Sequence, residues 1–243
     1  MRHGSRFLHD DKVNNFLQTV SNTTESRHKI ILPDKALWRA QLGYDKEELR
    51  ELHQDENTWI EYVPYKVERM KPLRNSAYEG RINPKGIPCL YTANDKETAI
   101  AEVRPHMGAL VSVAQMKVIR ELRLVNCING HDGICNFYFE EPSPEEREKS
   151  VWREIGRAFS EPVSPDPGIA AYVPTQILAE LFRQNRYDGV AYKSKLGPGY
   201  NIALFDLDIL EIVDVRLYPV KAVHYEIGEL KKSYVVKHKK IDF

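Results

Sequence analysis

The chain has 243 residues and a mass of 28.1 kDa, enough for one substantial hydrophobic core or one core with a small addition. Its 42% hydrophobic and 29% charged residues exclude an intrinsically disordered protein. Thirty-five basic and thirty-five acidic residues cancel, which argues against a broad nucleic-acid-binding face. No apolar run approaches the roughly eighteen residues of a membrane span, and three cysteines are too few for a disulfide framework, so we expect a cytoplasmic protein.

The N-terminal part of the chain predicts a helical extension followed by the start of a sheet. Apolar residues recur at helical spacing over residues 11–20, and the polar run 21–29 has the composition of a linker. We therefore expect residues 1–33 to be an N-terminal helical extension and residues 34–243 to be the main domain. The elements expected next are a strand at 36–42, a helix at 46–54, where helix-forming residues predominate, and an aromatic strand or loop at 58–67.

The second half of the chain predicts short strands interrupted by two helices. Ser143, Pro144 and Glu146 form a capping pattern that begins a helix running to about Phe159. The remaining expected elements are strands at 109–118, 121–125, 188–193, 201–205 and 209–218, turns at 129–133, a loop at 164–168, a helix at 175–185, and a hairpin or edge strands in the lysine-rich tail. Mostly short strands with three or four helices indicate an α+β fold.

Residues 79–105 concentrate side chains that could do chemistry. A proline–glycine turn at 84–86 precedes an apolar strand at 87–92, and Asn94 or Asp95 can cap the helix that follows. The loop, the strand end and the helix must lie close together, which brings three side chains into one place: Arg81, Tyr91 and Glu102. A cation, an aromatic plane and a carboxylate so arranged suit a nucleotide whose glycosidic bond is to be cleaved.

Each of these residues also has an ordinary structural explanation. Glu102 could be a solvated side chain on a surface helix, and Arg81 could belong to an ion pair. Tyr91 could be a core tyrosine at the end of a strand. Spacing alone leaves both explanations open.

Several motifs, in order along the chain, resemble the RES domain, the toxin fold of RES–Xre toxin–antitoxin modules. The motifs are LWRAQ at 37–41, Gly80-Arg81, Gly86-Ile87-Pro88, Leu90-Tyr91, ETAIAEV at 97–103, YDGVAYKS at 187–194 and NIALF at 201–205. The resemblance implies an ADP-ribosyltransferase-like fold with a mixed or antiparallel β core and flanking helices. It also implies an enzyme that degrades NAD as its substrate and needs no cofactor, and an Xre-type helix-turn-helix antitoxin as partner.

The resemblance implies a role for five residues. Glu102 stabilises the ribosyl cation, Arg39 and Arg81 hold the diphosphate, Tyr91 packs against the nicotinamide, and Ser194 orients the ligand. A long spacer separates the two arginines, which leaves Arg74 as a reserve candidate for the first of the pair. Taken alone, Ser194 would be a serine that ends a strand, and no triad can be inferred around it.

The acceptor of the reaction stays open at this stage. Water or phosphate would make the protein a glycohydrolase or phosphorylase that depletes NAD, whereas a protein or nucleotide acceptor would make it an ADP-ribosyltransferase. A non-catalytic module that binds an antitoxin or nucleic acid is the third reading. Cys127, His131 and Cys135 offer three ligands without paired spacing, so we expect no metal site, and we expect neither membrane association nor direct nucleic-acid binding.

Overall fold

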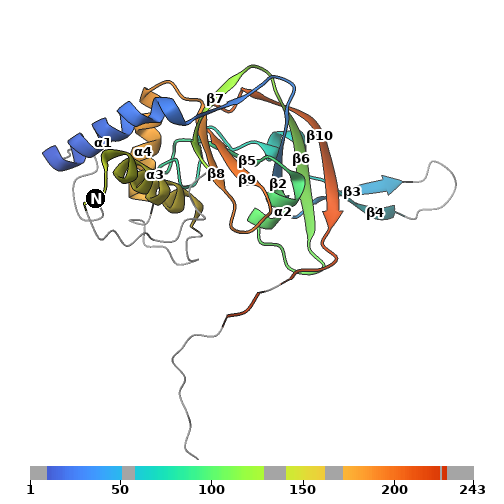
Figure 1. Cartoon of the computed structure of the whole chain (residues 1–243). Coiled ribbons are helices and arrows are strands. Elements are labelled where there is room, and N and C mark those ends of the chain that lie inside the picture. Colours follow the sequence, from blue (N-terminus) through green and yellow to red (C-terminus); the bar gives the residue numbers. More distant parts are fainter. Residues whose placement is uncertain (1–9, 51–57, 129–140, 162–171, 225, 229–243) are drawn as a thin grey trace, which may run out of the picture.

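An eight-stranded sheet forms the centre of the structure, a computed structural model that describes residues 10–50, 58–128, 141–161, 172–224 and 226–228 (Figure 1). The strand order is β1-β7-β8-β9-β5-β2-β6-β10, and every neighbouring pair is antiparallel except β7–β8. The strands are β1 (His28–Ile31), β2 (Ala36–Leu42), β5 (Leu90–Ala93), β6 (Leu110–Val118), β7 (Leu122–Cys127), β8 (Gly189–Lys193), β9 (Tyr200–Leu204) and β10 (Leu210–Pro219). This mixed, mostly antiparallel sheet with flanking helices confirms the predicted α+β class.

Four α-helices and two 3₁₀ turns accompany these strands in the described residues. They are α1 (Asp11–Thr24), η1 (Glu25–Arg27), η2 (Val67–Met70), α2 (Lys96–Glu102), α3 (Pro144–Ser160) and α4 (Val173–Gln184). The predicted start of α3 is confirmed, because the Ser143 side chain accepts a hydrogen bond from the Glu146 amide and the Glu146 carboxylate accepts one from the Ser143 amide. These reciprocal bonds satisfy amides that the first turn of a helix leaves unpaired.

The two faces of the sheet are covered in different ways. On one face, α3 and α4 pack over β7 and β8, and α1 packs against α4. The short helix α2 covers β2 and β5 on the same face, because Tyr91 and Ala93 lie two residues apart on β5 and point the same way. On the opposite face, the segment around η2 buries Met70 completely against the sheet. Because both faces are covered, a central strand such as β8 is buried along almost its whole length.

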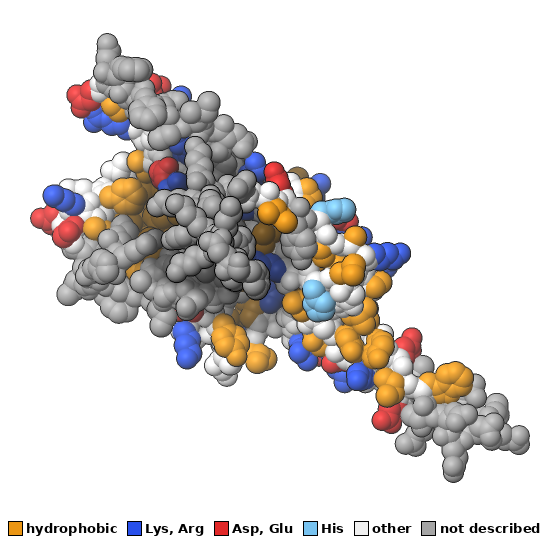
Figure 2. Space-filling view, turned by 90° about the horizontal axis from the view of Figure 1, so that it is seen from below, with side chains coloured by type: hydrophobic (Ala, Val, Ile, Leu, Met, Phe, Trp, Pro, Cys, Tyr) orange, Lys and Arg blue, Asp and Glu red, His pale blue; other side chains and the backbone are white. Residues whose placement is uncertain are grey.

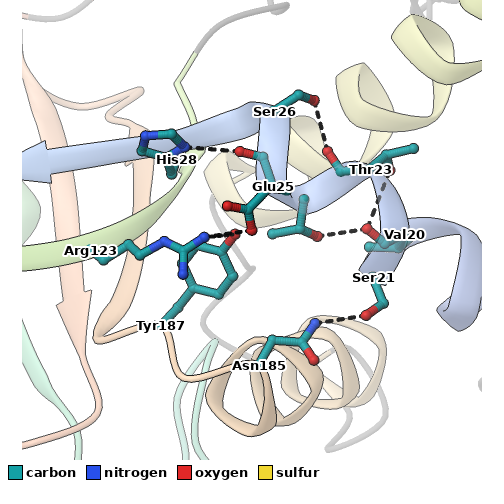
Figure 3. A network of polar contacts seen from close by, with 10 residues as sticks. Val20, Ser21, Thr23, Glu25, Ser26, His28, Arg123, Asn185 and Tyr187 are labelled. Carbon is teal, nitrogen blue, oxygen red and sulfur yellow. Dashed lines mark hydrogen bonds and ion pairs between the residues drawn. The ribbon is translucent and has the colours of Figure 1, made fainter.

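The linker predicted at 21–29 is wrong. Helix α1 runs into this stretch, η1 follows, and β1 then pairs with β7 as an edge strand of the main sheet. Figure 3 shows the polar contacts that hold the segment: Arg123 pairs with Glu25 at 2.5 Å, and Asn185 Nδ2 donates to Ser21 Oγ at 2.8 Å. The polar side chains of this segment therefore form hydrogen bonds and an ion pair with the rest of the protein, and the segment is not a free linker.

The helix predicted at 46–54 is also wrong. Residues Asp45–Arg50 form β3, which pairs with β4 (Thr58–Val63), and the two strands project from the body as an arm (Figure 1). Helix propensities differ by less than about 0.7 kcal/mol per residue, so pairing with an aromatic strand overrides them. Tyr62 contributes an edge-on contact with Tyr44, with ring centroids 4.7 Å apart.

The arm exposes apolar side chains, and Trp59 keeps 57% of its surface accessible. In Figure 2 the arm extends to the lower right, with hydrophobic side chains at its surface. Acidic and basic side chains are interspersed over the face drawn there and do not gather into one field. This mixing agrees with the zero formal net charge of the chain.

Some predictions concern residues outside the described part of the chain. The turns at 129–133, the loop at 164–168 and most of the lysine-rich tail are among them. The boundary between an extension at 1–33 and a domain at 34–243 stays a prediction, although β1 is a strand of the main sheet. The other predicted strands and helices are confirmed with ends shifted by a few residues.

Candidate active site

The central sheet splits beside strand β5, and a cavity opens there. Strands β2 and β5 share a single residue pair, Trp38–Ala93, whereas β2 pairs with β6 over its whole length. The cavity between the diverging strands has a volume of about 590 Å³, within the range of roughly 300–1,000 Å³ common for ligand sites. The side chains that matter below and line this cavity are Trp38, Arg39, Arg81, Tyr91, Glu102, Tyr172, Tyr192 and Asn201.

Glu102 enters the cavity from the last residue of α2. The helix begins at an N-cap, Asp95, whose side chain accepts from the Thr98 amide at 2.7 Å, so the predicted cap is confirmed at the second of the two candidates. One carboxylate oxygen of Glu102, Oε1, accepts hydrogen bonds from Ser194 Oγ and from Asn201 Nδ2, both at 2.7 Å. Glu102 is therefore a fixed carboxylate at the cavity wall and not a freely solvated side chain.

The hydroxyl of Ser194 has all of its hydrogen-bonding positions filled by the protein. It donates to Glu102 and accepts from the amides of Leu196 at 3.1 Å and Gly197 at 2.9 Å. The residue is 4% exposed and does not line the cavity. A hydroxyl with one donor and two acceptor positions has nothing left for a ligand. The structure thus joins Ser194 to the site through Glu102, and a direct contact with the ligand would require one of these bonds to break.

Arg39 lies on β2 where this strand separates from β5. Its Nη1 donates to the Tyr91 carbonyl at 2.9 Å, which satisfies a backbone acceptor on the open edge of β5. Its Nε is buried and has no hydrogen-bond partner among the described residues. Burial lowers the pKa of Arg39 to about 10, because removal from water disfavours the charged form, while nearby Tyr91 raises the pKa in part.

Arg81 reaches the same cavity from the loop before β5. Its Nη1 donates to the Phe159 carbonyl at 2.8 Å, in the last turn of α3, where helical carbonyls lack partners within the helix. Its guanidinium lies 5.9 Å from the centre of the Tyr192 ring. Within the described part of the chain, no carboxylate forms an ion pair with Arg39 or Arg81. The ion-pair explanation therefore has no support from the described residues.

Tyr91 shows its ring to the cavity and uses its hydroxyl elsewhere. The hydroxyl donates to Asn83 Oδ1 at 2.7 Å and accepts from the Ile82 amide at 3.1 Å, which ties it to the loop that carries Arg81. A Cβ at Gly80 would lie 2.4 Å from this hydroxyl, so the contact needs glycine at that position. Burial raises the pKa of Tyr91 well above its ordinary value, and the neighbouring Tyr192 adds to the effect, so the phenol is neutral.

Sequence comparison adds an identification to this geometry. The family model of the RES domain matches residues 61–226, more than half of the chain. The chain belongs to the RES domain family. The RES domain match contains all of α2 and the β8–β9 hairpin, and it begins after Arg39.

Further comparisons were made with curated proteins and with solved structures. The RES domain protein is similar to the solved M. tuberculosis MbcT–MbcA toxin–antitoxin complex, with 13% sequence identity, coverage of 84% of this chain and 97% of that chain, and a TM-score of 0.43. No curated protein matches the chain. Among the described residues of this RES domain protein, no helix has the length and apolar character needed to cross a membrane.

The structure shows four further residues of the RES domain site to which the sequence reasoning assigned no role or only a minor one. Gln176, fully buried on α4, donates through Nε2 to the carbonyls of Gly80 and Asn83, on either side of Arg81. Asn83 itself anchors the loop by donating to the Ile87 and Tyr78 carbonyls. Asn83 could have been found from the sequence, because it lies two residues after Arg81. Nothing in the sequence linked Gln176 to that loop. The other two residues, both at the cavity, are Tyr192 and Asn201.

Two alternatives raised by the sequence can be judged in the RES domain structure. Arg74 forms an exposed ion pair with Asp208 at 2.5 Å and does not line the cavity, whereas Arg39 lines it. Cys127 is a buried thiol on β7 whose pKa is raised to about 12 by burial, which makes it a poor metal ligand. His131 and Cys135 lie outside the described residues, and the described residues contain no cluster of three metal-ligating side chains.

Proposed function

We propose that this RES domain cleaves the bond between nicotinamide and ribose in NAD. The observation that carries the proposal is the charge pattern of the cavity: its lining contains one fixed carboxylate and two guanidinium groups that have no carboxylate partner among the described residues. Such a pattern suits a dinucleotide with an anionic diphosphate and a sugar that becomes cationic in the transition state.

The single carboxylate favours this bond over an ordinary glycosidic bond. Enzymes that cleave O-glycosides use two carboxyl groups, one of which protonates the leaving oxygen. Glu102 is the one carboxylate that lines the cavity in the part of the chain that the structure describes. A nicotinamide leaving group is already cationic and departs as a neutral base without a proton, so one carboxylate suffices.

The two arginines supply binding energy for the diphosphate. A guanidinium presents a planar set of donors to phosphate oxygens. Arg39 and Arg81 both line the cavity, so their guanidinium groups are the donors for the phosphate oxygens. Phosphate oxygens would provide hydrogen-bond acceptors and the negative charge that no described carboxylate provides to these arginines. Aromatic rings of Tyr91, Tyr192 and Trp38 line the same cavity and offer a wall for the flat nicotinamide.

The chemical step balances without a cofactor. The C1′–N bond breaks with its electron pair going to the pyridinium nitrogen, which releases neutral nicotinamide and leaves an oxocarbenium-like ribosyl group. Glu102 stabilises this positive charge through the oxygen that no described donor occupies. Water then forms a C1′–O bond and releases a proton, or phosphate forms the same bond. Loss of NAD by either route would arrest growth, and family resemblance makes an Xre-type antitoxin the expected partner.

A second candidate function keeps the site and changes the acceptor. An ADP-ribosyltransferase would pass the ribosyl group to a protein or a nucleotide. The cavity supports this reaction equally well, because the charges that stabilise the ribosyl cation are the same. The acceptor therefore has to be identified from the products.

Mass spectrometry of the products formed from NAD tests the proposal. Purified protein is incubated with NAD alone, with NAD and phosphate, and with NAD and a cell extract. Free nicotinamide with ADP-ribose indicates hydrolysis, ADP-ribosyl phosphate indicates phosphorolysis, and a modified macromolecule indicates transfer. We expect Glu102→Gln to lower nicotinamide release by about 100-fold to 1,000-fold.

Glu97→Gln is the matched control, because Glu97 lies on the same helix, does not line the cavity, and has an exposed side chain that pairs with Lys96 at 3.6 Å. This variant should retain the rate of the unmodified protein. Absence of nicotinamide release under all three conditions would contradict the proposal, as would equal rates for the two glutamine variants.

A further inference from the structure

We propose that Asn201 is a positioning residue that holds one oxygen of Glu102 so that the other oxygen is presented to the substrate. The inference rests on the proposed function, because it assigns Asn201 a part in the same reaction. It starts from the asymmetry of the bonds to the carboxylate. Oε1 accepts from both Ser194 and Asn201 at 2.7 Å, and no described residue donates to Oε2.

The two donors differ in how they relate to the cavity. Ser194 has both acceptor positions filled by backbone amides and does not line the cavity. Asn201 is 6% exposed and does line it, from the second residue of β9. Its amide still has a carbonyl oxygen and a second N–H that form no hydrogen bond with a described residue. Asn201 is thus the donor that both fixes Glu102 and faces the ligand.

The backbone around Asn201 is locked to the helix that carries Glu102. The Gly199 amide donates to Thr98 Oγ1 at 2.8 Å, and the Tyr200 amide donates to Asn94 Oδ1 at 2.6 Å. A Cβ at Gly199 would lie 1.9 Å from a carboxylate oxygen of Asp95, so the turn can approach α2 this closely only with glycine there. The β8–β9 hairpin is therefore hydrogen-bonded to α2 at both ends: backbone amides bond near the first residue of the helix, and Asn201 bonds to its last residue.

The competing explanation is that Asn201 merely satisfies a buried acceptor and has no part in the reaction. The variant Asn201→Asp distinguishes this explanation from a positioning role. With one proton shared, the introduced carboxylic acid can donate to Glu102 as the amide does. With both groups ionised, two negative charges lie within hydrogen-bond distance and repel, which displaces the Glu102 carboxylate. The other titratable or charged side chains around this pair are Arg39, Arg81, Tyr91, Tyr172 and Tyr192, and the variant changes none of them.

The sign of the stability change follows from this coupling. An aspartate in the unfolded chain has a pKa of about 3.9, whereas the introduced carboxyl beside Glu102 shares a proton to higher pH in the folded state. The folded variant then binds more protons than the unfolded one in this window, so stability is lost as pH rises from about 4. We expect the Tm deficit of Asn201→Asp against the unmodified protein to grow by about 5 °C between pH 5 and pH 8.

The experiment measures Tm and NAD turnover for the unmodified protein and for Asn201→Asp from pH 5 to pH 8. Asn185→Asp is the control, because Asn185 makes a comparable side-chain bond to Ser21 outside the cavity. We expect turnover by Asn201→Asp to recover at least tenfold relative to the unmodified protein as pH falls from 8 to 5. The ratio for Asn185→Asp should stay constant across the range.

The outcomes separate this inference from the proposed function. A pH-dependent Tm deficit without NAD turnover in the unmodified protein would overturn the proposed function while the coupling of the two residues remains visible. Parallel Tm curves, or turnover of Asn201→Asp that follows the unmodified protein at every pH, would overturn the inference. Should Asn201→Asp not fold, Asn201→Ala gives the answer: a fall in kcat of about 10-fold to 100-fold with KM nearly constant supports positioning, and unchanged kcat overturns it.

Discussion

Arginines in two regions of the molecule differ in whether a carboxylate lies beside them. At the N-terminal joint, where η1 meets the sheet through Glu25, Arg123 and Tyr187, Arg123 forms an ion pair with Glu25 at 2.5 Å and its guanidinium lies 4.6 Å from the centre of the Tyr187 ring (Figure 3). In the cavity, Arg39 and Arg81 donate to backbone carbonyls at 2.9 and 2.8 Å. The cation of Arg123 is therefore paired with a carboxylate, whereas the two cavity cations have no carboxylate partner in the described part of the chain.

This difference is the one expected between a structural arginine and an arginine that binds an anionic ligand. A paired and partly exposed arginine contributes little, about 0–1 kcal/mol, and its removal affects only the local joint. A partly buried guanidinium without countercharge is unfavourable in the free protein, and an anionic ligand relieves that penalty on binding. The predictions below test whether this contrast governs the chemistry, from the largest expected effect to the smallest.

Arg39→Met and Arg81→Met should each weaken binding of NAD by about 10-fold to 100-fold in KM, because each removes charged donors to the diphosphate, worth roughly 1.5–3 kcal/mol. Arg123→Met should leave KM unchanged and lower only the Tm. Steady-state kinetics with thermal unfolding of all three variants checks the contrast. Equal KM values for Arg39→Met and Arg123→Met would contradict the contrast between cavity and joint arginines.

ADP-ribose, which carries the diphosphate without nicotinamide, should stabilise the folded protein. At a concentration of 100 times its Kd the gain is about 2.7 kcal/mol, equivalent to a Tm rise of roughly 5–10 °C for a chain of this size. Differential scanning fluorimetry measures the shift, and Arg39→Met should reduce it to about half or less, because a 10-fold to 100-fold weaker Kd leaves the ligand at only about 10 to 1 times Kd. A shift of the same size in that variant would show that ADP-ribose binds elsewhere.

Ser194→Ala should lower both stability and turnover. The amides of Leu196 and Gly197 lose their acceptor and Glu102 loses one of two donors, at a cost of about 1–3 kcal/mol in stability. Because the hydroxyl holds Glu102 and does not reach the cavity, kcat should fall more than KM rises. Kinetics and thermal unfolding of this variant measure both effects. A rise in KM with unchanged kcat would instead indicate direct contact with the ligand.

Glu25→Gln should have the smallest effect. The carboxylate is 77% exposed, so solvent screens the pair with Arg123, and its loss should lower the free energy of unfolding by about 0.2–1 kcal/mol. Urea denaturation at low and high salt measures the change, which should shrink as salt rises. NAD turnover should not respond. A loss above about 2 kcal/mol would mean that the joint is more than a surface ion pair.

Much of the fold could be predicted because its signals are local. The capping box before α3, the cap before α2 and the apolar runs of β6, β8 and β9 depend on neighbours within a few residues. The two errors have one physical cause. The stretch 21–29 leads into β1, which pairs with β7, and residues 46–50 pair with β4, so strand pairing overrides weak local preferences in both places.

By itself the sequence determined which residue types the site would contain and where short-range geometry would group them, as with Arg81, Tyr91 and Glu102, which one loop, one strand and one helix connect. Only the tertiary structure decided what each of them bonds. The bond from Ser194 to Glu102, the bond from Arg39 to the Tyr91 carbonyl and the second donor on Glu102 each join residues separated by 50 or more positions. Hydrogen-bond saturation is a property of three-dimensional neighbourhoods, and a linear pattern carries no record of it.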